Sequence, residues 1–286
     1  MSQSAGPVSE PTVSVCIPTY RGANFLAETI RSVLGQTLTD LELLVLDDAS
    51  PDDTAGVVAQ LADPRLSYIR NESNIGAQAN WNRCLSVARG RYIKILPHDD
   101  LLHPKCLERQ VAVLESDADQ QIAMVCSARD MIDAAGRVLL RRGIPARIEG
   151  RVASADMVRR CLRGGTNLIG EPGAVLFRRS LAGRVGDFDA TYPYVIDLDY
   201  WFRLLAHGDA WVCAESLASF RMHRSNWTRE LAARQCTDLL GMIDTLAARG
   251  TIAASTRDRR LCKLRARLNQ ILRGVAFRLL APGNQT

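Results

Sequence analysis

Two adjacent carboxylates, Asp99 and Asp100, close the apolar run GRYIKILPHDD. Neighbouring carboxylates repel each other, and burying them is costly unless a cation or several hydrogen-bond donors balance the charge. Oxygen ligands suit Mg²⁺ or Mn²⁺, and either ion can join carboxylates to a diphosphate. The pair is therefore a candidate metal–diphosphate site. A solvated acidic turn is the alternative, and the pair taken alone favours that turn.

Three further polar clusters follow predicted strands or precede predicted helices. In DDAS, Asp48 could accept hydrogen bonds from a uracil-like base or from ribose hydroxyls, whereas helix capping explains Asp52 better. In PTYRG, the ring of Tyr20 could stack on a base. Asn74 and Gly76 form a turn signal before a helix whose N-terminus could face the nucleotide. Ordinary connections between strands and helices are the alternative for each cluster.

Strand-like and helix-like patterns alternate along the first half of the chain, which predicts an α/β fold with a mostly parallel sheet and helices on both faces. Strands are expected over 12–20, 41–50, 65–70 and 90–100, with helices over 24–36, 51–62 and 74–89. Ligands of open α/β sheets bind at the carboxyl ends of the strands. The polar clusters should therefore meet in one crevice.

The composition is that of a globular protein, with 286 residues, 47% apolar residues and a net charge of +5. This charge gives no reason to expect a nucleic-acid partner. The eight cysteines are scattered without a CxxC motif, which favours reduced, buried thiols in a cytoplasmic protein over disulfides or a zinc site. Residues 1–11 are polar and are interpreted as a disordered leader, and no window is apolar enough to cross a bilayer.

The C-terminal segment is unusually basic. Between Arg257 and Arg278 it contains eight basic residues and one acidic residue. At helical spacing it also carries an apolar stripe, formed by Leu261, Leu264, Leu268, Ile271, Leu272, Val275 and Leu279. Such a helix can lie on an anionic membrane, dock on the body of the protein or pair in a homodimer. The sequence leaves these alternatives open for residues 257–280.

The order of the motifs is more specific than any one of them. VSVCIPTYR, LELLVLDDASPDDT, NIGAQANWNRCL and ILPHDD are followed by EPGAVLFRRS, GDFD, DLDYWFRL and FRMH. This order resembles the family-2 glycosyltransferases, which have a Rossmann-like GT-A fold. The resemblance implies a catalytic domain over 12–227, with a nucleotide-binding half (12–103) and an acceptor half (104–227). Residues 228–286 are then a helical C-terminal extension.

On the nucleotide side, the resemblance implies that Thr19, Tyr20 and Asp48 bind the base. Asn74 and Gly76 would line the same pocket.

At the metal, the resemblance places HDD at the position of the family's DXD motif. Asp100 would be the direct metal ligand, and Asp99 would contact the ribose or the water shell of the metal. His98 departs from the acidic or small residue that many members carry, so its role is left open. His223 matches a histidine that contacts phosphate or metal in the family, and a surface position is its alternative.

On the acceptor side, DLDYWFRL matches the family's acidic motif at the start of a helix. An inverting transfer needs a carboxylate that removes the proton of the attacking hydroxyl. Asp197 is the predicted base and Asp199 the alternative, because a surface pair with Arg203 accounts for Asp199.

The resulting hypothesis is an inverting glycosyltransferase that uses a UDP- or dTDP-sugar with Mn²⁺ or Mg²⁺. The acceptor is a glycan or lipid-linked glycan of the cell envelope or surface polysaccharide, reached from the cytoplasm or its membrane face. A nucleotidyltransferase is one alternative, although PTYRGAN is a poor phosphate loop. A catalytically silent module that binds sugar nucleotides is the other.

Overall fold

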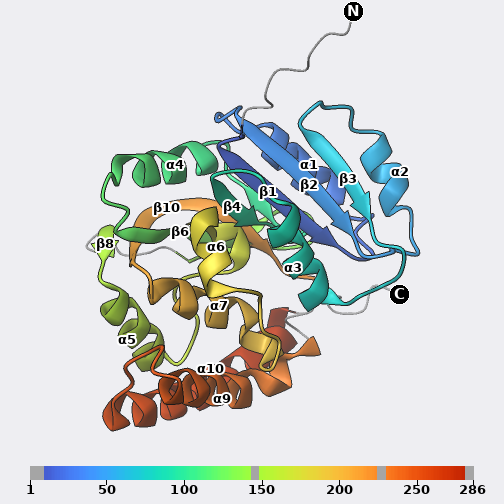
Figure 1. Cartoon of the computed structure of the whole chain (residues 1–286). Coiled ribbons are helices and arrows are strands. Elements are labelled where there is room, and N and C mark those ends of the chain that lie inside the picture. The colour runs from blue at the N-terminus through green and yellow to red at the C-terminus, as the bar shows by residue number, and fades with distance from the viewer. Residues whose placement is uncertain (1–9, 143–147, 224–229, 281–286) are drawn as a thin grey trace, which may run out of the picture.

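The computed structural model describes residues 10–142, 148–223 and 230–280, and the side chains of 142 and 273–280 are outside the description. The proposed leader at 1–11 falls almost entirely outside the described residues. The described chain forms one central sheet covered by helices on both faces (Figure 1). The expected α/β fold class is therefore confirmed.

The first half of the sheet is strictly parallel, with the strand order β3-β2-β1-β4. Its strands are β1 (Val13–Thr19), β2 (Leu41–Asp47), β3 (Leu66–Arg70) and β4 (Tyr92–Ile95). Each residue of β1, β2 and β4 is buried, as their nearly continuous apolar sequences predict for strands covered on both faces. This half of the sheet supplies three of the strand ends that the motifs follow.

Alternate residues of these strands pack against different helices. Val15 and Val45 belong to a core shared with α1 and α2, whereas Cys16 and Leu46 belong to one shared with α3. These helices are α1 (Leu26–Leu34), α2 (Thr54–Ala59) and α3 (Ala77–Val87). The two-residue period of the strands therefore produces the two faces of the sheet.

The second half of the sheet has mixed strand directions. β9 (Val175–Arg178) runs antiparallel between β4 and β6 (Ile122–Ile132), and β10 (Asp209–Arg221) runs parallel to β6. Three short strands complete the sheet by antiparallel pairing, namely β5 (Leu101–Leu102), β7 (Val138–Arg142) and β8 (Gly150–Val152). Reversing β9 lets the chain return to the centre of the sheet beside the HDD turn.

The helices of the second half complete both layers. α4 packs on the α1 side, and α5 and α7 pack on the α3 side. The elements are α4 (Cys106–Ser116), α5 (Ser154–Gly164), α6 (Arg179–Val185) and α7 (Ile196–Leu205), with short 3-10 turns η2 (Pro172–Ala174), η3 (Pro193–Val195) and η4 (Ala232–Arg234). The rings of Tyr200 and Trp201 in α7 pack against the ring of Phe177, and Tyr200 also stacks on Phe188. This packing fixes the start of α7, where the DLD motif lies.

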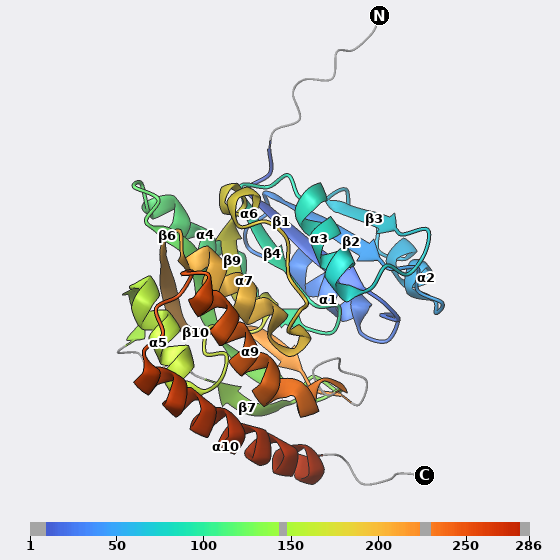
Figure 2. The ribbon, with the colours of Figure 1, turned by 60° about the horizontal axis from the view of Figure 1, so that its bottom comes forward.

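The chain ends in two helices, α9 (Gln235–Ala248) and α10 (Thr256–Leu280). Figure 2 shows α10 running along α5 and α9 at the edge of the molecule. Among the described residues, no helix is long and apolar enough to cross a membrane. The division of the chain at residue 228 stays a prediction, because α9 packs on η3 and α10 packs on α5.

Candidate active site

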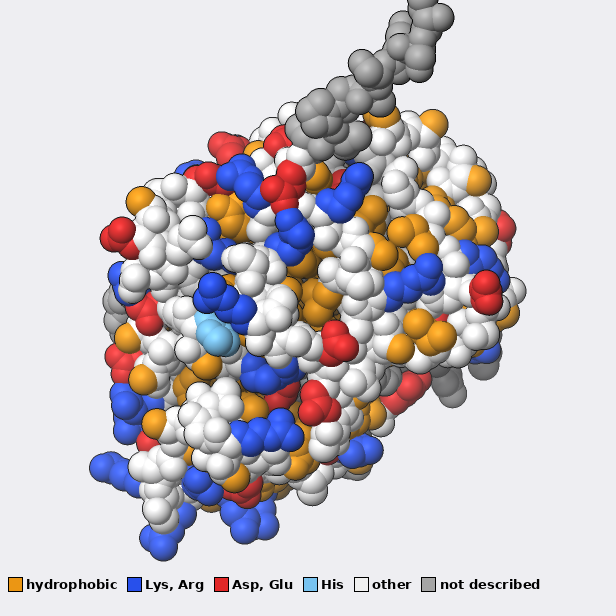
Figure 3. Space-filling view, viewed as in Figure 1, with side chains coloured by type: hydrophobic (Ala, Val, Ile, Leu, Met, Phe, Trp, Pro, Cys, Tyr) orange, Lys and Arg blue, Asp and Glu red, His pale blue; other side chains and the backbone are white. Residues whose placement is uncertain are grey.

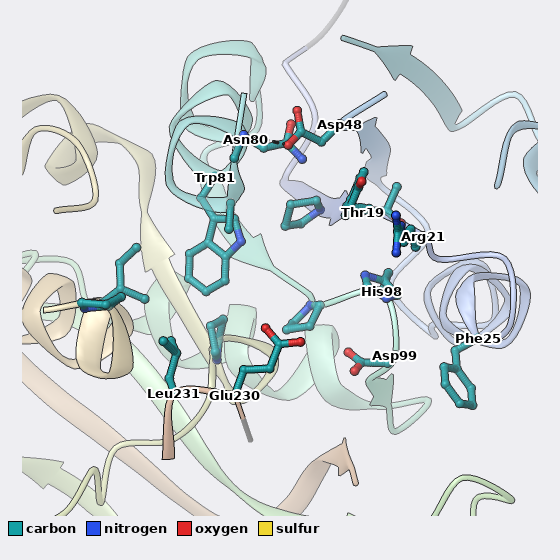
Figure 4. Close-up of a pocket in the computed structure, with 18 of the residues that line it drawn as sticks. Thr19, Arg21, Phe25, Asp48, Asn80, Trp81, His98, Asp99, Glu230 and Leu231 are labelled. Atoms are coloured by element: carbon teal, nitrogen blue, oxygen red, sulfur yellow. Dashed lines mark hydrogen bonds between the residues drawn. The ribbon is translucent and has the colours of Figure 1, made fainter. Parts of the chain in front are cut away.

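A cavity of about 930 Å³ lies at the carboxyl ends of β1, β2 and β4. Its walls come from the turns after those strands, the start of α3 and the start of α7. Figure 4 shows Asp48 and Asn80 at one end of the cavity, with His98 and Asp99 on the turn after β4. Glu230 and Leu231 lie on the wall below Trp81. The structure thus brings residues of all four predicted polar clusters into one pocket.

Asp48 organises the first end of this pocket. Its Oδ1 accepts hydrogen bonds from the backbone N–H of Ile75 (2.8 Å) and from Asn71 Nδ2 (2.7 Å). Its Oδ2 accepts one from the backbone N–H of Gly76 (2.9 Å). Asn74 Nδ2 donates to the carbonyl oxygen of Asp48 (3.3 Å). A carboxylate offers about four acceptor positions, so Asp48 retains capacity for a donor from a ligand.

Gly76 is required by the shape of this loop. Its φ is +86°, in the region that side chains rarely adopt, and it is the residue before α3. The turn signal of Asn74 and Gly76 therefore corresponds to a real backbone turn, and both residues line the pocket with Asp48.

The turn after β1 contributes a hydroxyl and an aromatic ring. Thr19 is 2% exposed and lines the pocket, and its Oγ1 has no hydrogen-bond partner within the described part of the chain. A buried hydroxyl without a partner is costly, which makes Thr19 a ready contact for a ligand. The neighbouring Tyr20 is 40% exposed and lines the same wall.

Arg21 also lines the pocket, although the sequence reasoning did not select it. Its guanidinium carbon lies 5.3 Å from the centre of the Tyr20 ring, and its backbone N–H donates to Ser50 Oγ (2.9 Å). Its φ is +56°, which is uncommon for a residue with a side chain. Backbone strain of this kind is often retained at functional sites. The sequence signal that could have identified Arg21 is a basic residue at a strand end, next to an aromatic ring.

Asp99 and His223 meet on the wall of the pocket. His223 Nε2 lies 2.8 Å from Asp99 Oδ2, and both residues line the cavity. The ring of Phe25 lies 4.7 Å from that of His223. Burial acts to raise the pKa of Asp99, but the hydrogen bond with His223 and the nearby His98 outweigh it, and the pKa lies below its usual value. Asp99 therefore faces the pocket as a carboxylate.

Asp100 lies behind this pair. It is 2% exposed, it is not among the residues that line the cavity, and its Oδ1 accepts the backbone N–H of Arg221 (2.9 Å). Burial and the neighbouring Asp99 raise the pKa of Asp100 well above its usual value. The sequence predicts Asp100 as the direct metal ligand, whereas the structure turns Asp99 toward the pocket.

Arg221 stabilises the HDD turn through hydrogen bonds from the protein interior. Its fully buried guanidinium donates to the carbonyl oxygen of Asp99 (2.8 Å) and to Glu28 Oε2 (2.6 Å), and it lies over the ring of Phe25. It also donates to the carbonyl oxygen of Ala134 (2.9 Å). Arg221 therefore positions the aspartates, and its guanidinium does not line the pocket. Arg224, the other arginine beside His223, lies outside the described residues.

Asp197, at the start of α7, also lines the pocket. Asn167 Nδ2 donates to its Oδ2 (2.9 Å), and the backbone N–H of Leu198 donates to its Oδ1 (2.7 Å). Burial and the carboxylate of Glu171 raise its pKa to about 7. A carboxyl with this pKa can accept a proton near neutral pH.

Asp199 has a different environment. It is 7% exposed, it is not among the residues that line the cavity, and its Oδ2 accepts the guanidinium of Arg203 (2.8 Å). This is the ion pair that the sequence spacing indicated as the alternative to a catalytic role, but it is largely buried and not at the surface as expected.

Several residues that line the pocket were not predicted from the sequence. Glu171 pairs with Arg129 beside Asp197, and Trp81, Pro193 and Tyr194 form an apolar wall. Glu171 lies in EPGAVLFRRS, where an acid before a proline at a strand start was the available signal. The apolar residues gave none, because an aromatic residue of a helix usually belongs to the core.

The donor set formed by Asp99 and His223 suits a divalent cation. No group of three or more potential ligands is close enough in the described chain to define a complete metal site by protein atoms alone. Asp99 could supply an oxygen ligand and His223 a nitrogen ligand to one side of a cation. The other coordination positions of that cation would face the pocket. Mg²⁺ and Mn²⁺ commonly take few protein ligands and complete their shell with water and phosphate oxygens. The residues therefore fit a cation bound together with a diphosphate.

The comparisons with known proteins agree with this geometry. The model of glycosyl transferase family 2 matches residues 14–186. An uncharacterised protein of Mycobacterium tuberculosis is 33% identical over 241 residues, covering 81% of this chain and 71% of its own. An uncharacterised glycosyltransferase of Rickettsia typhi is 27% identical, covering 76% of this chain and 66% of its own. The chain thus spans about two thirds of the length of these two relatives.

Solved structures share the fold. TarS 1–349 of S. aureus, in complex with UDP-GlcNAc, aligns with a TM-score of 0.65 at 17% identity, covering 94% of this chain and 76% of its own. The mannosyltransferase PcManGT of Pyrobaculum calidifontis, in complex with GDP-Man and Mn²⁺, aligns with a TM-score of 0.64 at 18% identity. That alignment covers 98% of this chain and 78% of PcManGT.

The fold, the pocket and the family match together define a glycosyltransferase. The chain belongs to glycosyl transferase family 2.

Proposed function

We propose that this enzyme moves a sugar from a nucleotide-diphosphate sugar to an acceptor hydroxyl with inversion at C1. UDP- and dTDP-sugars are the first donor candidates. The observation that carries the proposal is that Asp48, the pair of Asp99 and His223, and Asp197 all line one pocket. The nucleotide sugars bound to TarS and PcManGT support this class of donor.

The nucleotide occupies the end of the pocket beside β1 and β2. Asp48 accepts an N–H of the base, the hydroxyl of Thr19 supplies a further hydrogen bond, and the exposed ring of Tyr20 stacks on the base. Asn74 and Gly76 hold the loop that closes this end. Arg21 is close enough to the same wall to offset the charge of the diphosphate.

Asp99 and His223 hold the cation, Mn²⁺ or Mg²⁺. When bound, the cation offsets the negative charge that develops on the leaving diphosphate. The Mn²⁺ in PcManGT supports a divalent ion. Asp100, held by the backbone of Arg221, supports the turn and is the alternative ligand.

Asp197 removes the proton of the acceptor hydroxyl. The acceptor oxygen forms a bond to C1 as the bond between C1 and the diphosphate oxygen breaks, and the proton passes to the carboxylate. Asn167 and the N–H of Leu198 orient that carboxylate before the reaction. The products are a glycoside with inverted C1 and a nucleoside diphosphate.

The acceptor is a glycan or lipid-linked glycan of the cell envelope, approached from the cytoplasmic side. The apolar wall of Trp81, Pro193 and Tyr194 lies on the acceptor side of the pocket and suits the less polar face of a sugar ring or a group attached to it.

The test is a panel of nucleotide sugars with Mn²⁺ or Mg²⁺ and with a chelator. We expect slow, metal-dependent hydrolysis or transfer from one donor, with release of the nucleoside diphosphate, and a product of inverted anomeric configuration by NMR. Binding of a donor without any turnover would indicate a silent binding module. Release of pyrophosphate from a nucleoside triphosphate would indicate a nucleotidyltransferase.

The pH dependence of turnover should follow Asp197. Its pKa is raised to about 7, and the base must be unprotonated, so kcat is expected to rise with pH, to reach half of its maximum near pH 7 and to level off at higher pH. In Glu171→Gln the nearby negative charge is lost, so the rise should move to lower pH. A pH–rate profile of both proteins checks this, and a flat profile from about pH 5 to 8 would contradict it.

A further inference from the structure

α10 docks on the body of the protein through small and polar side chains. Cys262 and Ala266 are fully buried. Asn269 Nδ2 donates to the carbonyl oxygens of Gly164 (2.9 Å) and Gly165 (3.1 Å). A Cβ on Gly165 would lie 2.5 Å from the backbone nitrogen of Ala266, so the helix approaches α5 very closely.

Four large apolar residues of α10 point away from this contact. Leu264, Leu268, Ile271 and Leu272 are 67%, 48%, 64% and 57% exposed. Their spacing of four, three and one residues places them on one stripe of a helix with 3.6 residues per turn. These four residues of the apolar stripe found in the sequence therefore do not lie on the docked face, and the side chains of Val275 and Leu279 are outside the description. The helix α10 therefore docks on the body of the protein and at the same time exposes an apolar surface.

Basic side chains border this stripe. Arg260, Lys263 and Arg267 lie along one flank and Arg265 along the other, and all four are exposed. Within the described part of the chain, the ion pairs of α10 involve only Asp258 and Arg259. Figure 3 shows Lys and Arg side chains along the lower edge of the molecule, where Figure 1 places α9 and α10. The outer face of α10 is apolar at its centre and cationic at its borders.

The same helix is hydrogen-bonded to the segment that forms the pocket wall at Glu230 and Leu231. Gln270 Nε2 donates to the carbonyl oxygen of Ala233 (3.0 Å), close in the chain to Glu230 and Leu231, which line the cavity. α9 connects to the segment before Asp197, because Asp238 accepts the backbone N–H of Tyr194 (3.1 Å). A partner surface bound to α10 would thus lie near the part of the pocket that contains Glu230 and Leu231, where we expect the acceptor to enter.

We propose that the outer face of α10, from Arg257 to Leu272, binds the surface of an anionic lipid bilayer. Leucine and isoleucine enter the boundary of the acyl chains, and the arginines and lysine contact the lipid phosphates. The contact itself does not depend on the proposed sugar transfer. Its consequence for that reaction is a choice of substrate class, because a lipid-linked acceptor is delivered beside the pocket.

The charges argue against a second copy of the chain as the occupant. Two-fold pairing of this face would bring the cationic flanks of both copies together around a small apolar stripe. Like charges brought together at an interface oppose association, whereas an anionic lipid surface attracts every one of them.

Sedimentation of the full-length protein with vesicles tests the proposal. We expect binding to vesicles of phosphatidylcholine and phosphatidylglycerol in equal parts, weak binding to phosphatidylcholine alone, and release by high salt. Lys263→Gln/Arg267→Gln should lower the partition coefficient about 30-fold, at roughly fivefold for each basic residue near the surface. Leu264→Ser/Ile271→Ser should lower it by at least about 30-fold.

Matched variants control for nonspecific effects. Arg31→Gln/Arg184→Gln removes two exposed arginines elsewhere, and Leu264→Ile/Ile271→Leu keeps the stripe apolar, so both should bind like the unchanged protein. Equal binding by all variants would overturn the proposal. A concentration-dependent dimer without lipid, abolished by Leu264→Ser/Ile271→Ser, would also overturn it in favour of a second copy. Loss of vesicle binding with unchanged donor hydrolysis separates this inference from the proposed function.

Discussion

Asp197→Asn is expected to lower kcat by about 10³-fold or more while the affinity for the donor stays within about twofold, because a positioned general base contributes about 10²- to 10⁴-fold. Asparagine has nearly the same shape but cannot take the proton of the acceptor hydroxyl. The nucleotide end of the pocket, around Asp48, is untouched by the change. Steady-state kinetics and calorimetric titration with the donor measure the two quantities separately.

The same variant should remain folded. Folding raises the pKa of Asp197 from 3.8 to about 7, so between these values the folded state holds a proton that the unfolded chain has released. The contribution of this group to stability therefore falls as the pH rises through this range. Above about pH 7 the variant should be at least as stable to heat as the parent protein, apart from the rearranged hydrogen bond with Asn167.

Asp199→Asn is the matched control. It weakens the buried pair with Arg203 and should lower the melting temperature, yet kcat should change little because Asp199 does not line the cavity. If Asp199→Asn abolished turnover with donor binding intact and Asp197→Asn did not, the base would be Asp199.

Asp99→Asn is expected to reduce metal-stimulated kcat/KM by about 10³-fold and to raise the metal concentration required for half-maximal activity. Removing a carboxylate from a divalent-cation site weakens both the binding of the ion and its hold on the diphosphate. His223 would lose the charged partner that now lies 2.8 Å from its Nε2. Titration of activity with Mn²⁺ and with Mg²⁺ provides the measurement.

Asp100→Asn separates the two aspartates. The pKa of Asp100 is raised well above its usual value, and an amide oxygen can still accept the N–H of Arg221. We therefore expect a much smaller change in metal dependence than for Asp99→Asn. The opposite order, with Asp100→Asn losing the response to metal and Asp99→Asn keeping it, would restore Asp100 as the direct ligand.

Much of the fold could be predicted because its signals are local. The β-rich run of β1, the apolar run of β2 and the helical patterns of α1 and α3 are complete within short windows. The strands β5, β7 and β8 could not be predicted, since each is short and exists by pairing with β10 or β6. The reversed direction of β9 is likewise set by its neighbours β4 and β6.

The pocket residues divide in the same way. Asp48, Asn74 and Gly76 could be selected because a strand end and a turn signal mark them in the sequence. Arg21 and Glu171 carried only weak local signals and Trp81 none, because these residues become part of the site only by facing the same cavity. The leucine stripe of α10 was visible as a pattern, but the pattern did not indicate which side of the helix packs on α5.

The sequence by itself determined the α/β class, the order of the motifs and the strand ends at which they lie, because these follow from spacing along the chain. The tertiary structure decided that Asp99 rather than Asp100 faces the pocket, through contacts with His223 and Arg221 more than 120 residues away. Adjacent side chains on a turn leave in different directions, and only the groups packed around the turn settle which one meets the ligand.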